Sequence, residues 1–208
     1  MKIIVIHVPK TAGSSLTKAL RLKYGMRRVL RVANAEEVLA YEAMPITDKA
    51  RFDAFIGHRP LHLLERELPG ARTISIVREP IERQLSLYKH ALRYPHHDLH
   101  SLAKMGPEKW LLANERDPDL AWKNSMSRWF WKTSETIGAI ETLMERVELY
   151  FIEDIPALWN DLRLPNVKAQ NVSPTDAANL WDKSEIERAE STWSFDVKMY
   201  QSLRALRA

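Results

Sequence analysis

The feature that most constrains the fold is a short β-branched run at the start of the chain, residues 2–8 (KIIVIHV), which leads directly into the polar sequence PKTAGSS. Val and Ile favour strands, and a short apolar run without polar alternation indicates a strand that is buried on both faces. Similar runs occur at residues 52–58, 72–78 and 147–153. Helical segments separate these runs, so the sequence predicts an α/β fold, a parallel β-sheet flanked by helices.

The segments between the strands carry helix caps. Ser14 opens the first predicted helix, and Gly25 closes it. Pro80 stands in the first turn of the next predicted helix. We expect helices at residues 14–25, 81–94, 155–163 and 183–207, the last as one terminal helix. We also expect a helical insertion at about residues 99–147, broken near Pro107, Pro118 and Gly138, within a single domain of residues 1–208.

The composition is that of an ordinary globular protein. The 208 residues are 45% hydrophobic and 28% charged, and no apolar run approaches the roughly 20 residues of a membrane-spanning helix. The absence of cysteine excludes disulfides, a thiolate nucleophile and cysteine-based metal sites. It also fits a reducing compartment, and we expect the protein to be cytoplasmic.

Positive charge is concentrated at the start of the chain. The net charge is +4, yet residues 1–35 contain eight Lys or Arg residues and no acidic residue. Such a region creates a local positive field that attracts an anionic ligand. The sequence has no interleaved stripe of aromatic and basic residues, so we do not expect a nucleic-acid partner.

The polar segment after the first strand has the residues of an anion-binding loop. A loop between a strand and a helix exposes the first N–H groups of the helix, whose dipole favours an anion. Gly13 permits close approach of a phosphate, Lys10 supplies a positive charge, and hydroxyl donors come from Thr11, Ser14 and Ser15. The lysine precedes the glycine, unlike in a Walker A loop, which disfavours an ordinary nucleoside triphosphatase. The alternative is a tight turn with a serine cap.

A second candidate segment follows the predicted strand at residues 72–78. Arg78 ends this strand, and Ser86 lies eight residues later, two turns into the next helix. A chain reversal after Pro80 would bring both side chains to one phosphate, which arginine can bind in a bidentate manner. The alternative is an ion pair of Arg78 together with a surface serine, with no ligand.

Together the two segments resemble sulfotransferases that use 3′-phosphoadenosine 5′-phosphosulfate, above all the carbohydrate branch with the heparan sulfate 2-O-sulfotransferases. That branch carries His-x-Pro-Lys-Thr-[Ala/Gly]-[Gly/Ser]-[Ser/Thr] in one loop and Arg-[Asp/Glu]-Pro-x-x-Arg-x-x-Ser in another. Residues 7–15 and 78–86 match these patterns in order, each after a predicted strand. The resemblance implies a P-loop-kinase-like sulfotransferase fold.

The resemblance also implies roles for particular residues. The donor's 5′-phosphosulfate would be held by Lys10, Thr11, Ala12, Gly13, Ser14 and Ser15. Arg78 and Ser86 would hold its 3′-phosphate. A polar loop with Lys168, Asn171 and Ser173 would close over the nucleotide.

Direct sulfuryl transfer needs a general base for the acceptor hydroxyl and a group that stabilises the charge on the leaving oxygen. The transfer would leave adenosine 3′,5′-bisphosphate as the product. Lys10 is the expected stabiliser, and His58, at the end of a predicted strand, is the expected base. The resembling enzymes have a base histidine in a similar Gly-His step. They also have a second histidine two residues earlier, where this chain has Ile56. Glu65 is the reserve candidate for the base.

Other readings of the sequence stay open. The sequence HHDLH (His96, His97, Asp98 and His100) suggests a metal site, but we expect an exposed loop near the acceptor entrance and no metal.

A small-molecule kinase is one alternative function, and it would need a magnesium carboxylate at Glu153 or Asp154. A non-catalytic nucleotide-binding protein is another, and it would carry an inert His58. We expect a hydroxyl acceptor, a glycan or a small metabolite, while the oligomeric state is not readable from the sequence.

Overall fold

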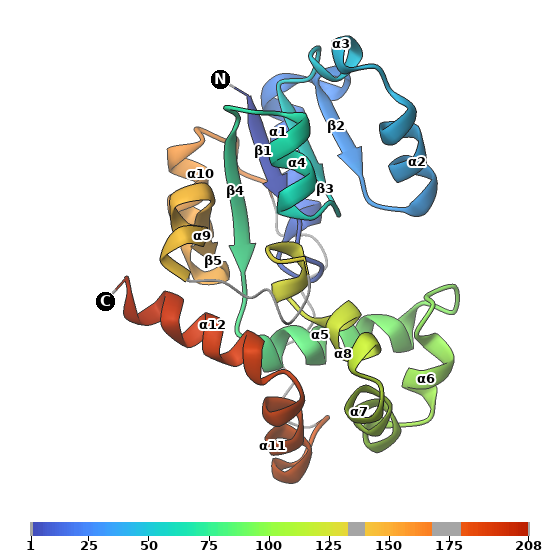
Figure 1. Cartoon of the computed structure of the whole chain (residues 1–208). Coiled ribbons are helices and arrows are strands. Elements are labelled where there is room, and N and C mark those ends of the chain that lie inside the picture. The colour runs from blue at the N-terminus through green and yellow to red at the C-terminus, as the bar shows by residue number, and fades with distance from the viewer. Residues whose placement is uncertain (1, 133–139, 168–179, 208) are drawn as a thin grey trace. The chain divides into compact units, whose positions relative to one another are not determined.

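A computed structural model of the chain describes residues 2–132, 140–167 and 180–207. The described residues fall into two compact units. Figure 1 colours the chain by residue number, from blue at the N-terminus to red at the C-terminus. One unit contains residues 2–77, 129–132 and 140–167, and the other contains residues 78–128 and 180–207. The expectation of a single domain therefore stays a prediction, and each unit is described by itself.

The first unit is built on a parallel sheet. Its strands are β1 (Ile3–Ile6), β2 (Val29–Val32), β3 (Ala54–Gly57), β4 (Arg72–Val77) and β5 (Glu148–Phe151). They pair in the order β2-β3-β1-β4-β5, and every pair is parallel (Figure 1). The predicted parallel α/β fold is confirmed. Strand β2 was not predicted, because it is short, lies at the edge of the sheet and has the exposed Arg31 in its middle.

Helices cover both faces of this sheet. They are α1 (Gly13–Tyr24), η1 (Met26–Arg28), α2 (Ala35–Ala43), α3 (Ile46–Lys49), α4 (Leu61–Glu67), α9 (Ile140–Arg146), η4 (Ile152–Asp154) and α10 (Ile155–Asp161). Successive strand residues point to opposite faces. On one face Ile3 and Val5 share a buried cluster with Leu16 of α1 and Leu158 of α10. On the other face Tyr41 of α2 packs on Phe55, with ring centroids 5.2 Å apart.

The second unit is described as helices and connecting loops. They are α5 (Pro80–Arg93), α6 (His100–Lys104), α7 (Pro107–Arg116), α8 (Pro118–Asn124), α11 (Lys183–Thr192) and α12 (Ser194–Ala205). A further 3₁₀ turn, η2 (Ser127–Trp129), follows α8, and its last residue, Trp129, belongs to the first unit. The predicted breaks at Pro107 and Pro118 are helix starts, because proline fits the first turn. The predicted break at Gly138 lies outside the described residues.

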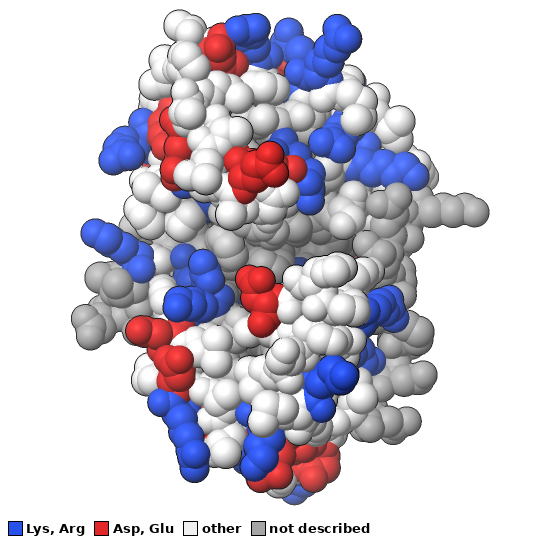
Figure 2. Space-filling view, turned by 90° about the vertical axis from the view of Figure 1, so that its right-hand side faces the viewer, with Lys and Arg blue, Asp and Glu red and all other residues white. Residues whose placement is uncertain are grey.

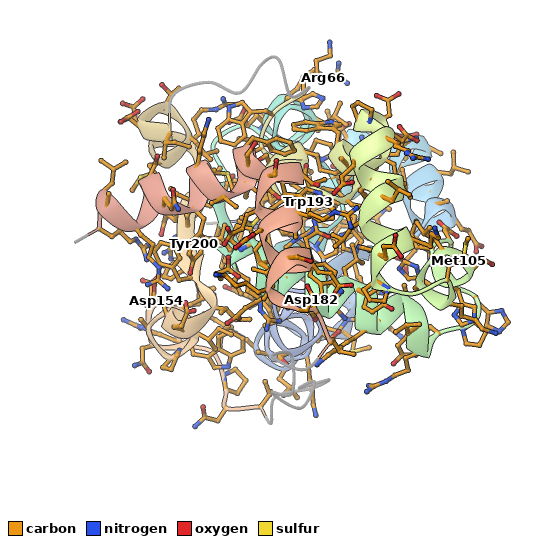
Figure 3. All side chains as sticks on the ribbon, turned by 90° about the horizontal axis from the view of Figure 1, so that it is seen from below. Arg66, Met105, Asp154, Asp182, Trp193 and Tyr200 are labelled. Atoms are coloured by element: carbon orange, nitrogen blue, oxygen red, sulfur yellow. The ribbon has the colours of Figure 1, made fainter. Side chains whose placement is uncertain are left out.

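The predicted single terminal helix is wrong, because two helices, α11 and α12, meet at Trp193 (Figure 3). Trp193 leaves the helical conformation, with φ −108° and ψ 36°. Its ring is fully buried, and its indole Nε1 donates a hydrogen bond to the carbonyl of Ala121 at 3.1 Å. Burial of a large aromatic ring with its N–H satisfied outweighs the local preference for a continuous helix.

Candidate active site

The carboxyl ends of β1 and β3 bring two histidines together. Ile6 is paired with Gly57 in the parallel register, so the next residues, His7 and His58, leave the sheet side by side. Backbone hydrogen bonds fix both positions, from His7 N to the carbonyl of Gly57 at 3.0 Å and from His58 N to that of Val32 at 2.7 Å. Ligands of parallel sheets bind at this edge. The resemblance pointed to His58, and the structure adds His7 beside it.

The loop between β1 and α1 has an unusual backbone. Lys10 and Ala12 both adopt left-handed conformations, with φ values of 72° and 65°. Such conformations cost about 1–3 kcal/mol each in residues other than glycine and cluster at functional sites. Ala12 caps α1 and has no side chain that accepts a hydrogen bond, and the first turn of α1 contains no acidic residue. The start of α1 is therefore suited to an external anion.

Helix α5 offers a contrast, because its start is already occupied by a carboxylate. Glu79 caps it, and its side chain accepts hydrogen bonds from the N–H groups of Ile81 at 3.1 Å and Glu82 at 2.6 Å. This carboxylate supplies the negative charge that a helix N-terminus favours. Of the two helices in the matched segments, α1 is thus the one whose first turn is prepared for a phosphate.

The three hydroxyl residues of the loop differ in their roles. The Thr11 side chain is buried, and its hydroxyl donates to the carbonyl of Val8 at 2.8 Å. Its proton therefore stabilises the loop, in contrast to the expected donation to a phosphate. Ser14 is exposed and Ser15 is buried, both in the first turn of α1. A phosphate role for these two serines stays a prediction.

Gly13 is required by the side chain of His7. A Cβ atom at Gly13 would lie only 1.8 Å from Nε2 of His7 and 2.2 Å from two ring carbons. Glycine therefore lets the imidazole pack against the first residue of α1. The same imidazole stacks on that of His58, with centroids 4.5 Å apart and planes inclined by 23°.

The hydrogen bond of His58 defines its tautomer. Its Nδ1 lies 2.8 Å from the carbonyl oxygen of His7, and a carbonyl only accepts, so Nδ1 carries the proton. In the neutral ring Nε2 then has the lone pair that a general base needs. The ring of Trp129 lies on His58 as well, at a centroid distance of 5.4 Å. His58 is thus held by two aromatic neighbours and one backbone carbonyl.

His7 is kept neutral by its surroundings. Burial, followed by the neighbouring His58 and the cations Arg31 and Lys10, lowers the pKa of His7 from 6.5 to about 3. At neutral pH the imidazole therefore stacks on His58 without adding a charge beside it.

The reserve base, Glu65, is engaged elsewhere. Its carboxylate on α4 accepts two hydrogen bonds from the guanidinium of Arg146, one of them 2.6 Å long. A bidentate arginine stabilises the ionised carboxylate and occupies the oxygens that would take a proton. The geometry therefore favours His58 over Glu65.

The residues expected to hold the 3′-phosphate lie at the start of the second unit. Arg78 follows β4 directly and forms an ion pair with Glu82, with Nη2 and Oε2 separated by 3.2 Å. Ser86 is buried on α5. Asn171 and Ser173, expected over the nucleotide, lie outside the described residues, as does Lys168.

The second arginine of the same segment has a structural environment. Arg83 is fully buried, and both terminal nitrogens donate to the carbonyl of Asn124, at 2.9 and 2.6 Å. Gln84 donates to the same oxygen at 2.9 Å. These bonds join α5 to the end of α8, so Arg83 supports the segment from inside.

The histidines at residues 96–100 form local contacts. His97 Nδ1 accepts from the N–H of Leu99 at 3.1 Å, and His100 Nδ1 donates to the carbonyl of Ala91 at 2.8 Å. Within the described ranges no three or more His, Asp or Glu side chains are grouped as metal ligands. His96 and Asp98 are exposed, as expected for a loop, whereas a place near an acceptor entrance stays a prediction.

Asp154, one of the two carboxylates that a kinase would need, contacts the backbone at the end of β5. The Asp154 carboxylate accepts a hydrogen bond from the N–H of Phe151 at 3.2 Å and caps the turn after β5.

On the face in Figure 2, basic and acidic side chains are interspersed. No helix in the part of the chain that the structure describes is long and apolar enough to cross a membrane.

Comparisons with known proteins show which family and fold the chain is similar to. A profile described as "Sulfotransferase family" matches residues 1–124. A sulfotransferase from Alicyclobacillus acidocaldarius has a similar fold, with a TM-score of 0.55, 12% identity, and coverage of 97% of this chain and 94% of that one. The mouse sulfotransferase SULT7A1, crystallised with PAP, is 12% identical, with a TM-score of 0.47 and coverage of 95% of this chain and 64% of that one. A comparison with curated protein sequences finds no match. The profile covers more than half of the residues, so the chain belongs to the sulfotransferase family.

Proposed function

We propose that the protein transfers the sulfuryl group of 3′-phosphoadenosine 5′-phosphosulfate to an acceptor hydroxyl. The observation that carries this proposal is the edge of the sheet where β1 and β3 end. There a helix start without a side-chain cap, a left-handed Lys10 and a tautomerically defined His58 occur together. An anion site beside a base is the pair of functions that transfer from an anionic donor requires.

In this proposal the donor is held through its phosphates. The side chains of Lys10, Ser14 and Ser15, with backbone N–H groups of residues 10–15, bind the 5′-phosphosulfate. Arg78 and Ser86 bind the 3′-phosphate. Arg78 then gives up its ion pair with Glu82 and forms one with the phosphate. Asn171 and Ser173 close over the nucleotide. The motif likeness to the heparan sulfate 2-O-sulfotransferases supports these assignments.

The reaction would proceed by direct displacement. His58 Nε2 takes the proton of the acceptor hydroxyl, whose oxygen forms a new bond to sulfur. The bond from sulfur to the 5′-phosphate oxygen breaks, and its electron pair stays on that oxygen. The Lys10 ammonium stabilises this developing charge, and adenosine 3′,5′-bisphosphate leaves. The proton remains on His58 until solvent removes it.

We further propose that the acceptor is a hydroxyl of a carbohydrate or a small metabolite and that the protein acts in the cytoplasm. The likeness to the carbohydrate branch supports the first point, and the absence of cysteine fits the second.

Transfer of radiolabelled sulfate to a panel of hydroxyl compounds tests the proposed function. We expect a labelled product with at least one sugar or small alcohol, formed together with one equivalent of bisphosphate. Phosphoryl transfer from ATP to the same panel, without sulfate transfer, would show that the protein is a kinase. Donor binding without any turnover would show a binding protein.

A further inference from the structure

A side chain outside the roles assigned so far lies between the proposed base and the phosphate loop. Resting on the proposed function, we propose that His7 is a positioning residue whose imidazole couples the proposed base His58 to the start of α1. Occupation of the loop by a phosphate then changes the placement of His58.

The contact of His7 with His58 has two parts. The imidazoles stack at 4.5 Å, and the carbonyl of His7 accepts the proton of His58 Nδ1 at 2.8 Å. The backbone of each residue is anchored to the sheet, at Gly57 and Val32. A displacement of the His7 ring therefore acts on the His58 ring directly, while the main chain of both residues stays fixed.

The contact of His7 with the phosphate loop is equally close. The His7 imidazole occupies the space in which Gly13 would carry a Cβ atom, since that atom would be 1.8 Å from Nε2. Gly13 is the first residue of α1, where the proposed 5′-phosphate would meet the helix. A small movement of the helix start on phosphate binding is thus transmitted to the ring, because packed groups at contact distance do not yield independently.

The charges around His7 make it suitable for this role. The ionisable groups that act on it are His58 of the β3 edge, Arg31 of β2 and Lys10 of the loop. Burial of the His7 ring, and then these three groups, disfavour a positive charge on it, so His7 stays a neutral packing surface. It can position His58 without competing for the proton that the base must take.

The coupling is measurable by NMR spectroscopy on histidine-labelled protein. In the wild type, adenosine 3′,5′-bisphosphate should shift the His58 ring resonances. In His7→Ala and His7→Gln, which remove the ring, we expect this shift to fall by at least half, while the Kd for bisphosphate changes less than about threefold. His7→Phe retains an aromatic ring and should restore most of the shift.

Kinetics give a second readout once an acceptor is known. A misplacement of about 1 Å can cost 10²-fold in rate, so kcat of His7→Ala should fall about 10²-fold with little change in donor KM. The matched control is His62→Ala, an exposed histidine of the same unit, which should behave like the wild type. If His7→Ala does not fold, His7→Gln carries the same expectations.

The failures of the two proposals are distinguishable. If bisphosphate binds and the His58 shift is the same in the wild type, His7→Ala and His7→Gln, the coupling is refuted while the proposed function stands. If the wild type does not bind bisphosphate, the proposed function falls and the coupling falls with it.

Discussion

Substitution of Gly13 by alanine tests the packing between the phosphate loop and His7. The added Cβ would lie 1.8 Å from His7 Nε2, whereas ordinary contact begins at 3.4 Å, so ring and helix must separate by about 1.6 Å. Overpacking of this kind costs about 1–3 kcal/mol. Alanine has a helix propensity up to about 1 kcal/mol better than glycine, which offsets only part of this cost. With the full offset subtracted, we expect a net loss of up to about 2 kcal/mol in the free energy of unfolding.

The same displacement should disturb the proposed base, because His7 stacks on His58. We expect the turnover of Gly13→Ala to fall by about 10²-fold, the cost of a misplacement of about 1 Å. The matched control is Gly70→Ala, where φ is +75° and the new atom meets nothing within 4 Å. That variant should lose about 1–2 kcal/mol of stability through backbone strain and keep its turnover. Urea denaturation and sulfate transfer measure both quantities, and a Gly13→Ala protein as stable and active as the wild type would show that the His7 ring does not fill the space beside Gly13.

Three further outcomes are expected. Lys10→Ala should lower turnover by about two to three orders of magnitude and weaken bisphosphate binding less, because charge on the leaving oxygen develops in the transition state; a larger loss of binding than of turnover would make Lys10 only an anchor. Calorimetry should show that the wild type binds bisphosphate more tightly than AMP and that Arg78→Ala binds bisphosphate at least tenfold more weakly. Glu82→Gln should bind bisphosphate up to about fivefold more tightly, because it releases Arg78 from its ion pair. Equal affinity for AMP and bisphosphate would contradict the assignment of Arg78 and Ser86 to the 3′-phosphate. Stability should fall as the pH drops below 6.5, because the unfolded chain protonates His7 while the folded protein holds its pKa at about 3. At pH 5 this contribution is up to about 2 kcal/mol, and urea denaturation of His7→Gln should show that much less loss between pH 7 and pH 5 than the wild type.

The sheet and the loop after β1 were predictable because their signals are local. A buried strand shows as a short apolar run, and the loop shows as lysine, glycine and hydroxyl residues at fixed positions. Strand β2 lacks such a signal, since an edge strand leaves Arg31 in solvent. The break between α11 and α12 depends on where Trp193 is buried, which is a tertiary property.

The candidate site was predictable only in part for the same reason. The likeness to a known motif pointed to His58, but its stacking on His7 depends on the register that pairs Ile6 with Gly57. The sequence does not contain that register explicitly. Likewise, the hydroxyl of Thr11 was expected to face a phosphate and instead donates to Val8, a choice set by the backbone of the loop. Pairing partners of polar side chains are decided by geometry that composition does not reveal.

We propose His58 as the general base of a sulfuryl transfer. The most direct measurement is the steady-state transfer of labelled sulfate by His58→Ala, with bisphosphate binding determined on the same preparation. We expect a loss of turnover of roughly 10²–10⁴-fold with almost unchanged bisphosphate affinity, since the proposed base acts only on the acceptor's proton. Near-normal turnover in His58→Ala would show that His58 is not the base.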